Sequence, residues 1–213
     1  MAVLITKQNT IFDKELKSIF EREGYTVFIA GENEPTGYID MYIDTSNYRS
    51  DKDTFLIRDG LDEKIIREVY EENVLNSMRL LENYLPYLEK GTGKRICFLT
   101  SHEASINETT HDNGYAYKMS KAAMHNLYPM VMNILADDGY TIRIYDPLLS
   151  NGHNTNEQTK KQCKINNIVC DKLSAEGAFN YFVRKRGTEH DDPLRNDENR
   201  IVFRDALGRE HTW

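Results

Sequence analysis

A tyrosine and a lysine stand four residues apart in the stretch Y-K-M-S-K-A-A, as Tyr117 and Lys121. In a helix this spacing places both side chains on one face. An ammonium group near a phenol favours the phenolate, so we expect Lys121 to lower the pKa of Tyr117 from its ordinary value of about 10. Such a tyrosine can exchange a proton with a substrate oxygen.

Ser101 is a third residue that could take part in this chemistry. It follows the apolar run R-I-C-F-L-T directly, where a strand would end. Its hydroxyl could hold a carbonyl or alcohol while Tyr117 moves the proton. On spacing alone, a solvated helix face accounts better for the Tyr–Lys pair. The two interpretations differ in whether Ser101, Tyr117 and Lys121 share one cleft.

The elements that must position these residues alternate along the chain. Short β-rich runs predict strands at residues 3–6, 25–31, 38–44, 95–100, 140–146 and 201–205. Between them, helical periodicity predicts helices near Phe12–Phe20, at residues 62–90 and 115–136, and from Ser174, as N-cap, to Arg186. This alternation predicts βαβ units, and hence a mainly parallel sheet with helices on both faces. Ligands of such sheets bind beyond the carboxyl ends of the strands.

Composition narrows the class of protein. We expect the 213 residues to form a single domain, residues 1–213, because no shift in composition divides them. A net charge of -7 and a pI near 5.4 argue against binding nucleic acid or an anionic membrane. No apolar run approaches the roughly 20 residues that span a bilayer, and no signal peptide is visible. We therefore expect a cytoplasmic protein.

The remaining polar residues suggest no metal site. No histidine pair has metal-motif spacing, so His102, Glu103 and His111 are interpreted as polar loop residues and His125 as a surface or interface residue. The three cysteines show no C-x-x-C spacing and are expected to be reduced thiols. Residues 148–164 carry no recognisable signature, and the polar stretch 155–167 is open to interpretation as a lid or a weak helix.

From Asn73 onward the chain resembles the short-chain dehydrogenase/reductase (SDR) family. The family's Y-x-x-S-K-A-A segment appears as Y-K-M-S-K-A-A, and its strand-closing serine is matched by Ser101 in G-K-R-I-C-F-L-T-S. Its helix asparagine is matched by Asn73 in V-Y-E-E-N-V. The resemblance implies Tyr117 as acid/base, Ser101 as substrate holder, Lys121 on a nicotinamide ribose, and Asn73 holding a relay water.

The cofactor side departs from the family's T-G-x-x-x-G-x-G loop. Here the loop is T-K-Q-N-T-I-F-D, with Lys7, Ile11 and Asp13 in place of the glycines. Those glycines let a diphosphate approach a helix N-terminus, which a side chain at Ile11 blocks and a carboxylate at Asp13 repels. Lys7 could offer a compensating charge. The resemblance implies NAD or NADP, with Thr6, Lys121 and Pro147 as contacts, while the lost glycines predict weak or absent binding.

The sequence also implies a shortened fold. After the second strand, G-E-N-E-P-T-G leads almost directly to Asp44–Asn47, which stand where the family has N-N-A-G. We therefore expect a Rossmann-type three-layer α/β domain that lacks a strand-helix region after its second strand. Part of the adenosine pocket would be missing with it.

Three functions remain open. The first is an SDR-type oxidoreductase acting on a small carbonyl or alcohol substrate. The second is a non-redox proton-transfer enzyme, an isomerase or dehydratase, that uses the same residues. The third is a catalytically silent binding or scaffold protein. Apolar residues on the outer faces of the helices around Asn73 and Tyr117 (Leu75, Met78, Leu81, Tyr84, Met124, Leu127, Met130 and Ile134) predict a homodimer or homotetramer.

Overall fold

The computed structural model describes residues 1–54, 58, 60–107, 114–148, 170–184, 197 and 201–213. Within them, six strands form one sheet in the order β2-β1-β3-β4-β5-β6, and every neighbouring pair is parallel. The strands are β1 (Ala2–Ile5), β2 (Thr26–Ile29), β3 (Met41–Asp44), β4 (Arg95–Leu99), β5 (Thr141–Asp146) and β6 (Phe203–Asp205).

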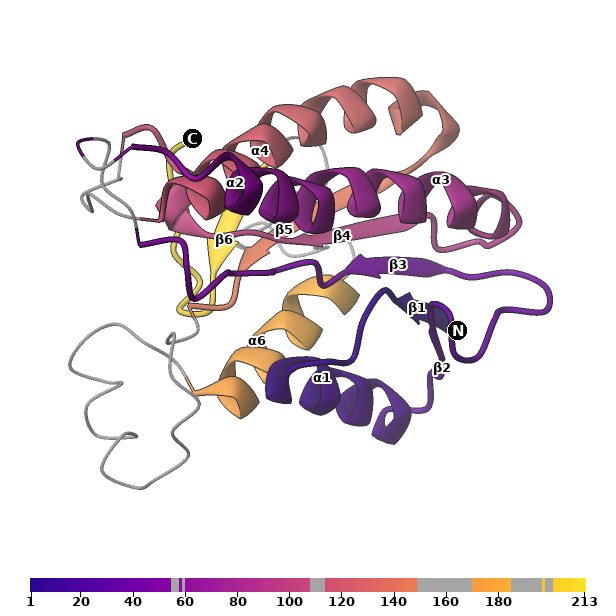
Figure 1. Cartoon of the computed structure of the whole chain (residues 1–213). Coiled ribbons are helices and arrows are strands. Elements are labelled where there is room, and N and C mark those ends of the chain that lie inside the picture. The colour runs from indigo at the N-terminus through magenta and orange to yellow at the C-terminus, as the bar shows by residue number, and fades with distance from the viewer. Residues whose placement is uncertain (55–57, 59, 108–113, 149–169, 185–196, 198–200) are drawn as a thin grey trace.

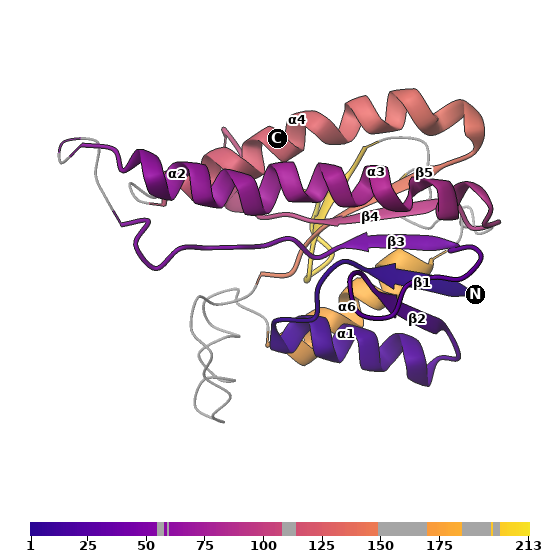
Figure 2. The same ribbon diagram turned by 45° about the vertical axis from the view of Figure 1, so that its right-hand side comes forward.

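Helices cover both faces of the sheet (Figures 1 and 2). One face carries α1 (Ile11–Arg22) and α6 (Asp171–Val183). The other carries α2 (Glu63–Tyr70), α3 (Asn76–Glu89) and α4 (Tyr115–Leu135). The prediction of a Rossmann-type three-layer α/β arrangement with a parallel sheet is confirmed.

The period-two alternation of the strands divides the core into two layers. Val3 and Ile5 of β1 pack in the cluster that contains α1 and α6, whereas Leu4 packs in the cluster of α3 and α4. All three side chains are fully buried. Strands buried on both faces need continuous apolar runs, which is why A-V-L-I does not alternate with polar residues.

The expected shortening of the fold is confirmed. After β2 the chain reaches β3 through residues 30–40, which contain no helix. β2 pairs only with β1 among the described strands, so it forms one edge of the sheet. The described residues between β2 and β3 therefore supply no further strand or helix to extend this edge.

Several local predictions need correction. The last helix begins at Asp171 and not at Ser174. Ser174 lies within the first turn of this helix, and its hydroxyl donates to the Pro147 carbonyl at 2.7 Å. The helix predicted over residues 62–90 contains a π-helical turn at Glu71–Leu75 between α2 and α3. Of the apolar residues assigned to outer helix faces, three lie in the core instead: Leu81, Tyr84 and Met124.

Three interpretations concern residues outside the described part of the chain. They are the 155–167 stretch, residues 149–164 of the segment without a recognisable signature, and His111. Within the described part of the chain, no helix is long and apolar enough to cross a membrane. The described His, Cys, Asp and Glu residues form no cluster that could hold a metal ion.

Candidate active site

The start of α4 is fixed by a carboxylate from a distant loop. Gly114 precedes the helix with a φ of 74°, a left-handed conformation that glycine adopts without strain. Asp53, which is buried, accepts hydrogen bonds from the backbone N–H groups of Ala116 at 3.2 Å and Tyr117 at 2.9 Å. A negative charge at a helix N-terminus also interacts favourably with the helix dipole. Asp53 thereby fixes the first turn, which carries Tyr117.

Tyr117 lies in a closed environment at the carboxyl rim of the sheet. Only 2% of its surface is exposed. Its hydroxyl donates to Asn47 Oδ1 at 2.6 Å, and the Ser101 side chain is close enough to affect its pKa. The Arg49 guanidinium lies over its ring, 3.4 Å from the centroid. The Asn47–Arg49 segment therefore covers this side chain.

The pKa of Tyr117 is shifted opposite to the expected direction. Burial raises it to about 12, the carboxylates of Glu103 and Asp146 add to the rise, and the Arg49 charge and the Ser101 hydrogen bond oppose it. The expectation that Lys121 brings this pKa toward neutrality is wrong for this conformation. Because burial penalises the charged phenolate, Tyr117 is a protonated phenol at neutral pH.

Lys121 is fully buried one helical turn after Tyr117. Its Nζ donates to the backbone carbonyls of Ser46 and Leu99, the latter at 3.1 Å, and lies 6.0 Å from the Tyr117 ring centroid. Burial lowers the pKa of Lys121 to about 8, against the opposing charge of Asp44. Lys121 therefore links the loop after β3 to the end of β4.

Asn73 lies in the π-helical turn and holds the loop that follows β3. Its Oδ1 accepts from the Tyr48 backbone N–H at 2.7 Å, and its Nδ2 donates to the Tyr48 carbonyl at 2.8 Å and to Ser120 Oγ at 3.0 Å. The extra residue of a π-turn often occurs at functional sites. Through Tyr48, Asn73 positions the neighbouring residues Asn47 and Arg49.

Ser101 lies two residues after β4 and caps a 3-10 turn at His102–Ala104. Its Oγ accepts from the Glu103 N–H at 3.2 Å. Glu103 in turn forms a two-point ion pair with Arg49 at 2.6 and 3.2 Å. Ser101 and Lys121 thus lie near Tyr117, and Asn73 holds the loop that covers it, but none of the four lines the described cavity.

Sequence reasoning missed Asn47, Arg49 and Glu103 as neighbours of Tyr117. Arg49 and Glu103 are 54 positions apart, and nothing in either segment points to the other. One signal was available for Asn47, since it occupies the last position of the segment that stands for N-N-A-G. A polar side chain at that position was a candidate for contact with the site.

Lys7 and Thr10 of the turn after β1 and Asp13 of α1 line a cavity of about 310 Å³, whose lining does not include Thr6, Lys121 or Pro147. Thr6 Oγ1 accepts from the Thr45 N–H at 2.9 Å, and Lys7 Nζ pairs with Glu72 at 2.8 Å, so the compensating charge of Lys7 is already used. Pro147 is buried at the end of β5. The cavity lies between the turn after β1, the loop after β3, and the α2 helix with its π-turn; it is lined by Lys7, Asn9, Thr10, Phe12, Asp13, Thr45, Asn47, Tyr48, Glu68, Glu72 and Leu99.

Asp13 closes the N-terminal turn of α1. Its carboxylate accepts from the Thr10 N–H at 2.9 Å, and the Thr10 hydroxyl accepts from the Asp13 N–H at 3.1 Å. A backbone hydrogen bond from Asn9 also reaches this carboxylate. Burial raises the pKa of Asp13 to about 6 despite these hydrogen bonds.

Leu148, after Pro147, stands where the family has the glycine of its proline-glycine pair. Its φ of 50° is in the left-handed region that favours glycine. The backbone conformation of a glycine is thus retained at this strand end although the residue has changed.

Comparison with known proteins agrees with this architecture. No family model matches the chain. A 75-residue segment is 31% identical to the C-signal of Myxococcus xanthus and covers 35% of this chain and 45% of that protein. An 88-residue segment is 30% identical to 1-hydroxy-2-glutathionyl-2-methyl-3-butene dehydrogenase of Rhodococcus sp. (strain AD45), covering 41% and 38%. The matched segments thus span less than half the length of either relative.

Solved structures match over the whole chain. A Burkholderia multivorans protein described as a short-chain alcohol dehydrogenase superposes with a TM-score of 0.72 at 12% identity, covering 100% of this chain and 99% of that one. The fold is that of the short-chain dehydrogenases/reductases. A carbonyl reductase from Pseudomonas aeruginosa PAO1, solved in complex with NADP, shares this SDR fold with a TM-score of 0.68 at 14% identity over the same coverage. The resemblance that the motifs indicated is confirmed at the level of the fold.

Proposed function

We propose that this chain is an SDR-type enzyme that acts on a small substrate with a carbonyl or alcohol group, and that Tyr117 is its proton-transfer residue. One observation carries the proposal. Tyr117 and Lys121 are both buried, with the Lys121 Nζ 6.0 Å from the Tyr117 ring centroid, and the Ser101 side chain, from a separate segment, is close enough to lower the pKa of Tyr117. Because the phenol is protonated at neutral pH, it is suited to giving its proton to a carbonyl oxygen.

The neighbouring residues have distinct proposed roles. Ser101 would hold the substrate oxygen beside Tyr117. Lys121 stabilises the phenolate that forms as the proton leaves, an electrostatic effect that is strong in a site without water. Asn73 keeps one free lone pair on Oδ1 beyond its bond to Tyr48, and this lone pair would accept from the relay water.

An oxidoreductase is the form of this activity that the named relatives support. One relative carries the name of a dehydrogenase, and a solved neighbour is a carbonyl reductase in complex with NADP. A nicotinamide cofactor would supply or accept the hydride that such a reaction needs. Thr6, Lys121 and Pro147 are the residues proposed on the nicotinamide side.

The diphosphate of such a cofactor does not fit the residues at the start of α1. The backbone N–H of Thr10, which could bind an anion there, already donates to the Asp13 carboxylate. The cavity wall also contains Glu68 and Glu72, so a diphosphate would meet three carboxylates against the single charge of Lys7. We therefore derive no reaction step through a dinucleotide.

This misfit favours the non-redox form of the same chemistry. An isomerase or dehydratase needs a proton donor beside the substrate oxygen and needs no hydride. Tyr117 supplies that donor in both forms. In a binding or scaffold protein without turnover, the hydroxyls of Tyr117 and Ser101 would take part in no reaction.

Titration with NADH and NADPH distinguishes the oxidoreductase from the non-redox enzyme. By calorimetry we expect weak or absent binding of both dinucleotides to the purified protein, because the Asp13 carboxylate occupies the place where their diphosphate would bind. A dissociation constant in the low micromolar range would restore the oxidoreductase form. An Asp13→Gly variant serves as the matched comparison, and it should bind both dinucleotides more tightly than the wild type does.

A further inference from the structure

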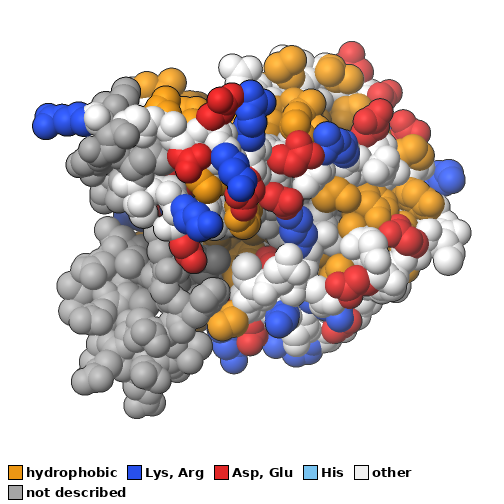
Figure 3. Space-filling view, in the orientation of Figure 1, with side chains coloured by type: hydrophobic (Ala, Val, Ile, Leu, Met, Phe, Trp, Pro, Cys, Tyr) orange, Lys and Arg blue, Asp and Glu red, His pale blue; other side chains and the backbone are white. Residues whose placement is uncertain are grey.

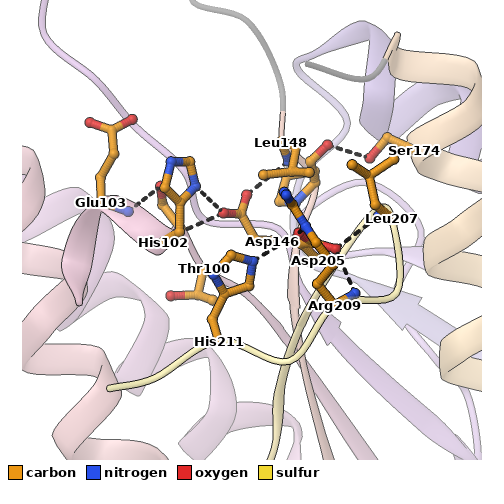
Figure 4. A network of polar contacts seen from close by, with 12 residues as sticks. Thr100, His102, Glu103, Asp146, Leu148, Ser174, Asp205, Leu207, Arg209 and His211 are labelled. Atoms are coloured by element: carbon orange, nitrogen blue, oxygen red, sulfur yellow. Dashed lines mark hydrogen bonds and ion pairs between the residues drawn. The ribbon is translucent and has the colours of Figure 1, made fainter. Parts of the chain in front are cut away.

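A histidine-aspartate pair adjoins the proposed site. His102 follows Ser101 in the chain, and Asp146 ends the neighbouring strand β5. Asp146 Oδ2 accepts from both the backbone N–H and the Nδ1 of His102, each at 2.7 Å (Figure 4). A carboxylate only accepts hydrogen bonds, so the Nδ1 of His102 carries a proton.

This arrangement leaves Nε2 of His102 available as a base. Asp146 is 3% exposed, and its Oδ1 accepts from the Leu148 N–H at 2.8 Å, so the carboxylate is fixed in position. In a neutral imidazole with Nδ1 protonated, Nε2 has a lone pair. Nε2 has no hydrogen bond to any described residue, and 39% of the side chain is exposed. The ring is therefore oriented on one side and accessible on the other.

Charged groups around His102 raise its pKa above the ordinary value. The hydrogen bond to Asp146 raises the pKa of His102, burial opposes this, Glu103 adds to the rise, and His211 lowers it. The His211 ring lies 5.9 Å away and is itself bonded to Asp205 at 2.8 Å (Figure 4).

His102 and Tyr117 belong to one neighbourhood. Glu103, next to His102 in the chain, pairs with Arg49, whose guanidinium lies 3.4 Å from the centroid of the Tyr117 ring. The two carboxylates nearest His102, those of Asp146 and Glu103, both act on the pKa of Tyr117 and raise it. The site thus combines a protonated phenol with an accessible imidazole lone pair.

We propose that His102 is a second catalytic residue, which removes a proton from the carbon beside the substrate carbonyl while Tyr117 protonates the carbonyl oxygen. Asp146 is the positioning residue that orients the ring. This inference rests on the proposed function in its non-redox form. It names the substrate class as small ketones or hydroxyketones with a hydrogen on that carbon.

The step balances without an oxidant or reductant. The C–H bond breaks, its electron pair forms a carbon-carbon double bond, and its proton goes to Nε2 of His102. The carbonyl π pair moves to oxygen, which takes the Tyr117 proton. With a simple ketone, the His102 proton returns to the same carbon and the enol oxygen returns its proton to Tyr117, so the carbon has exchanged its hydrogen. With a hydroxyketone, the enediol takes the His102 proton at the former carbonyl carbon. The hydroxyl on the carbon that lost its hydrogen then gives its proton to Tyr117 and becomes the new carbonyl, which completes an isomerisation.

Deuterium exchange tests this step. Hydroxyacetone and acetoin in D₂O are followed by proton NMR, with wild-type protein, Tyr117→Phe, His102→Gln and the control Glu21→Gln on the exposed end of α1. We expect wild type and control to accelerate exchange beside the carbonyl, and both Tyr117→Phe and His102→Gln to slow it about 100-fold or more. An unchanged rate in His102→Gln together with loss in Tyr117→Phe overturns the role of His102 and leaves the proposed function standing. No wild-type acceleration contradicts both.

The pH dependence tests the positioning role of Asp146. The base must be neutral, so exchange falls as pH drops through the pKa of His102. Because Asp146 raises that pKa, Asp146→Asn should move the acid limb of the profile to lower pH. An unmoved limb would show that Asp146 does not act through His102.

Discussion

Asp13 carries a carboxylate that is almost completely buried at the start of α1, with 2% of the residue exposed. Burial raises its pKa from 3.8 to about 6. Between these values the folded protein holds a proton that the unfolded chain has released, so the free energy of unfolding decreases as pH rises from about 4 to 6. A shift of this size corresponds to roughly 3 kcal/mol.

Asp13→Asn should remove this pH dependence while keeping an acceptor for the Thr10 N–H. Urea unfolding at pH 4 and pH 7 should show that wild type loses about 3 kcal/mol more than the variant does. Glu21→Gln, at the exposed other end of α1, is the control and should follow wild type. Parallel pH curves for wild type and Asp13→Asn would contradict the burial of a carboxylate here.

At the scale of single residues, the sequence indicated which residues could form the site but not what surrounds each of their side chains. The family pattern located Ser101, Tyr117, Lys121 and Asn73 in segments that the fold brings together. The direction of the Tyr117 pKa was wrong, because burial depends on which loop covers the ring. Arg49 and Asn47 cover it, and their positions are set by Asn73 and Glu103 from other parts of the chain.

Among the elements, α4 depends on a cap from outside itself. Its first-turn N–H groups at Ala116 and Tyr117 donate to Asp53, so Asp53→Ala should cost about 1–2 kcal/mol in the free energy of unfolding. The same change should speed hydrogen exchange of the Tyr117 amide, because the loop no longer holds it. Asp62→Ala is the matched control, since Asp62 caps α2 in the same way. Equal Tyr117 exchange in wild type and Asp53→Ala would refute the capping role.

Helices and strands were largely predictable because their core positions repeat locally. The start of α6 was not, since Ser174 has the residue type of an N-cap but its hydroxyl bonds the distant Pro147 carbonyl. The π-helical turn at Asn73 was missed, although the buried residues Val69 and Val74 on either side of Asn73 are five positions apart instead of the usual three or four. The shortened edge of the sheet was predictable, because the sequence has only a short connection, residues 30–40, between β2 and β3.

At the scale of the whole molecule, the helices on one face of the sheet carry exposed apolar residues. Hydrophobic side chains gather over the α3 and α4 side of the molecule (Figure 3). The exposed residues there include Leu75, Met78, Met130 and Ile134, the last with 72% of its surface exposed. Two adjacent helices with such residues are typical of a protein interface.

We therefore predict a homodimer or homotetramer. Light scattering at micromolar concentration should give two or four times the chain mass of 24.8 kDa. Ile134→Arg should lower that mass by placing a charge in the interface. Leu173→Arg is the control, because Leu173 is exposed on α6 across the sheet. A monomeric mass for wild type would exclude this assembly.

Proton transfer by Tyr117 is the central claim, and Tyr117→Phe tests it most directly because only the hydroxyl is removed. The measurement is the rate at which wild type and variant convert or exchange small ketones, with circular dichroism to verify the fold and Tyr115→Phe as the control. The account predicts a loss of about 100-fold or more in Tyr117→Phe and none in the control. Wild-type rates in a folded Tyr117→Phe protein would contradict it.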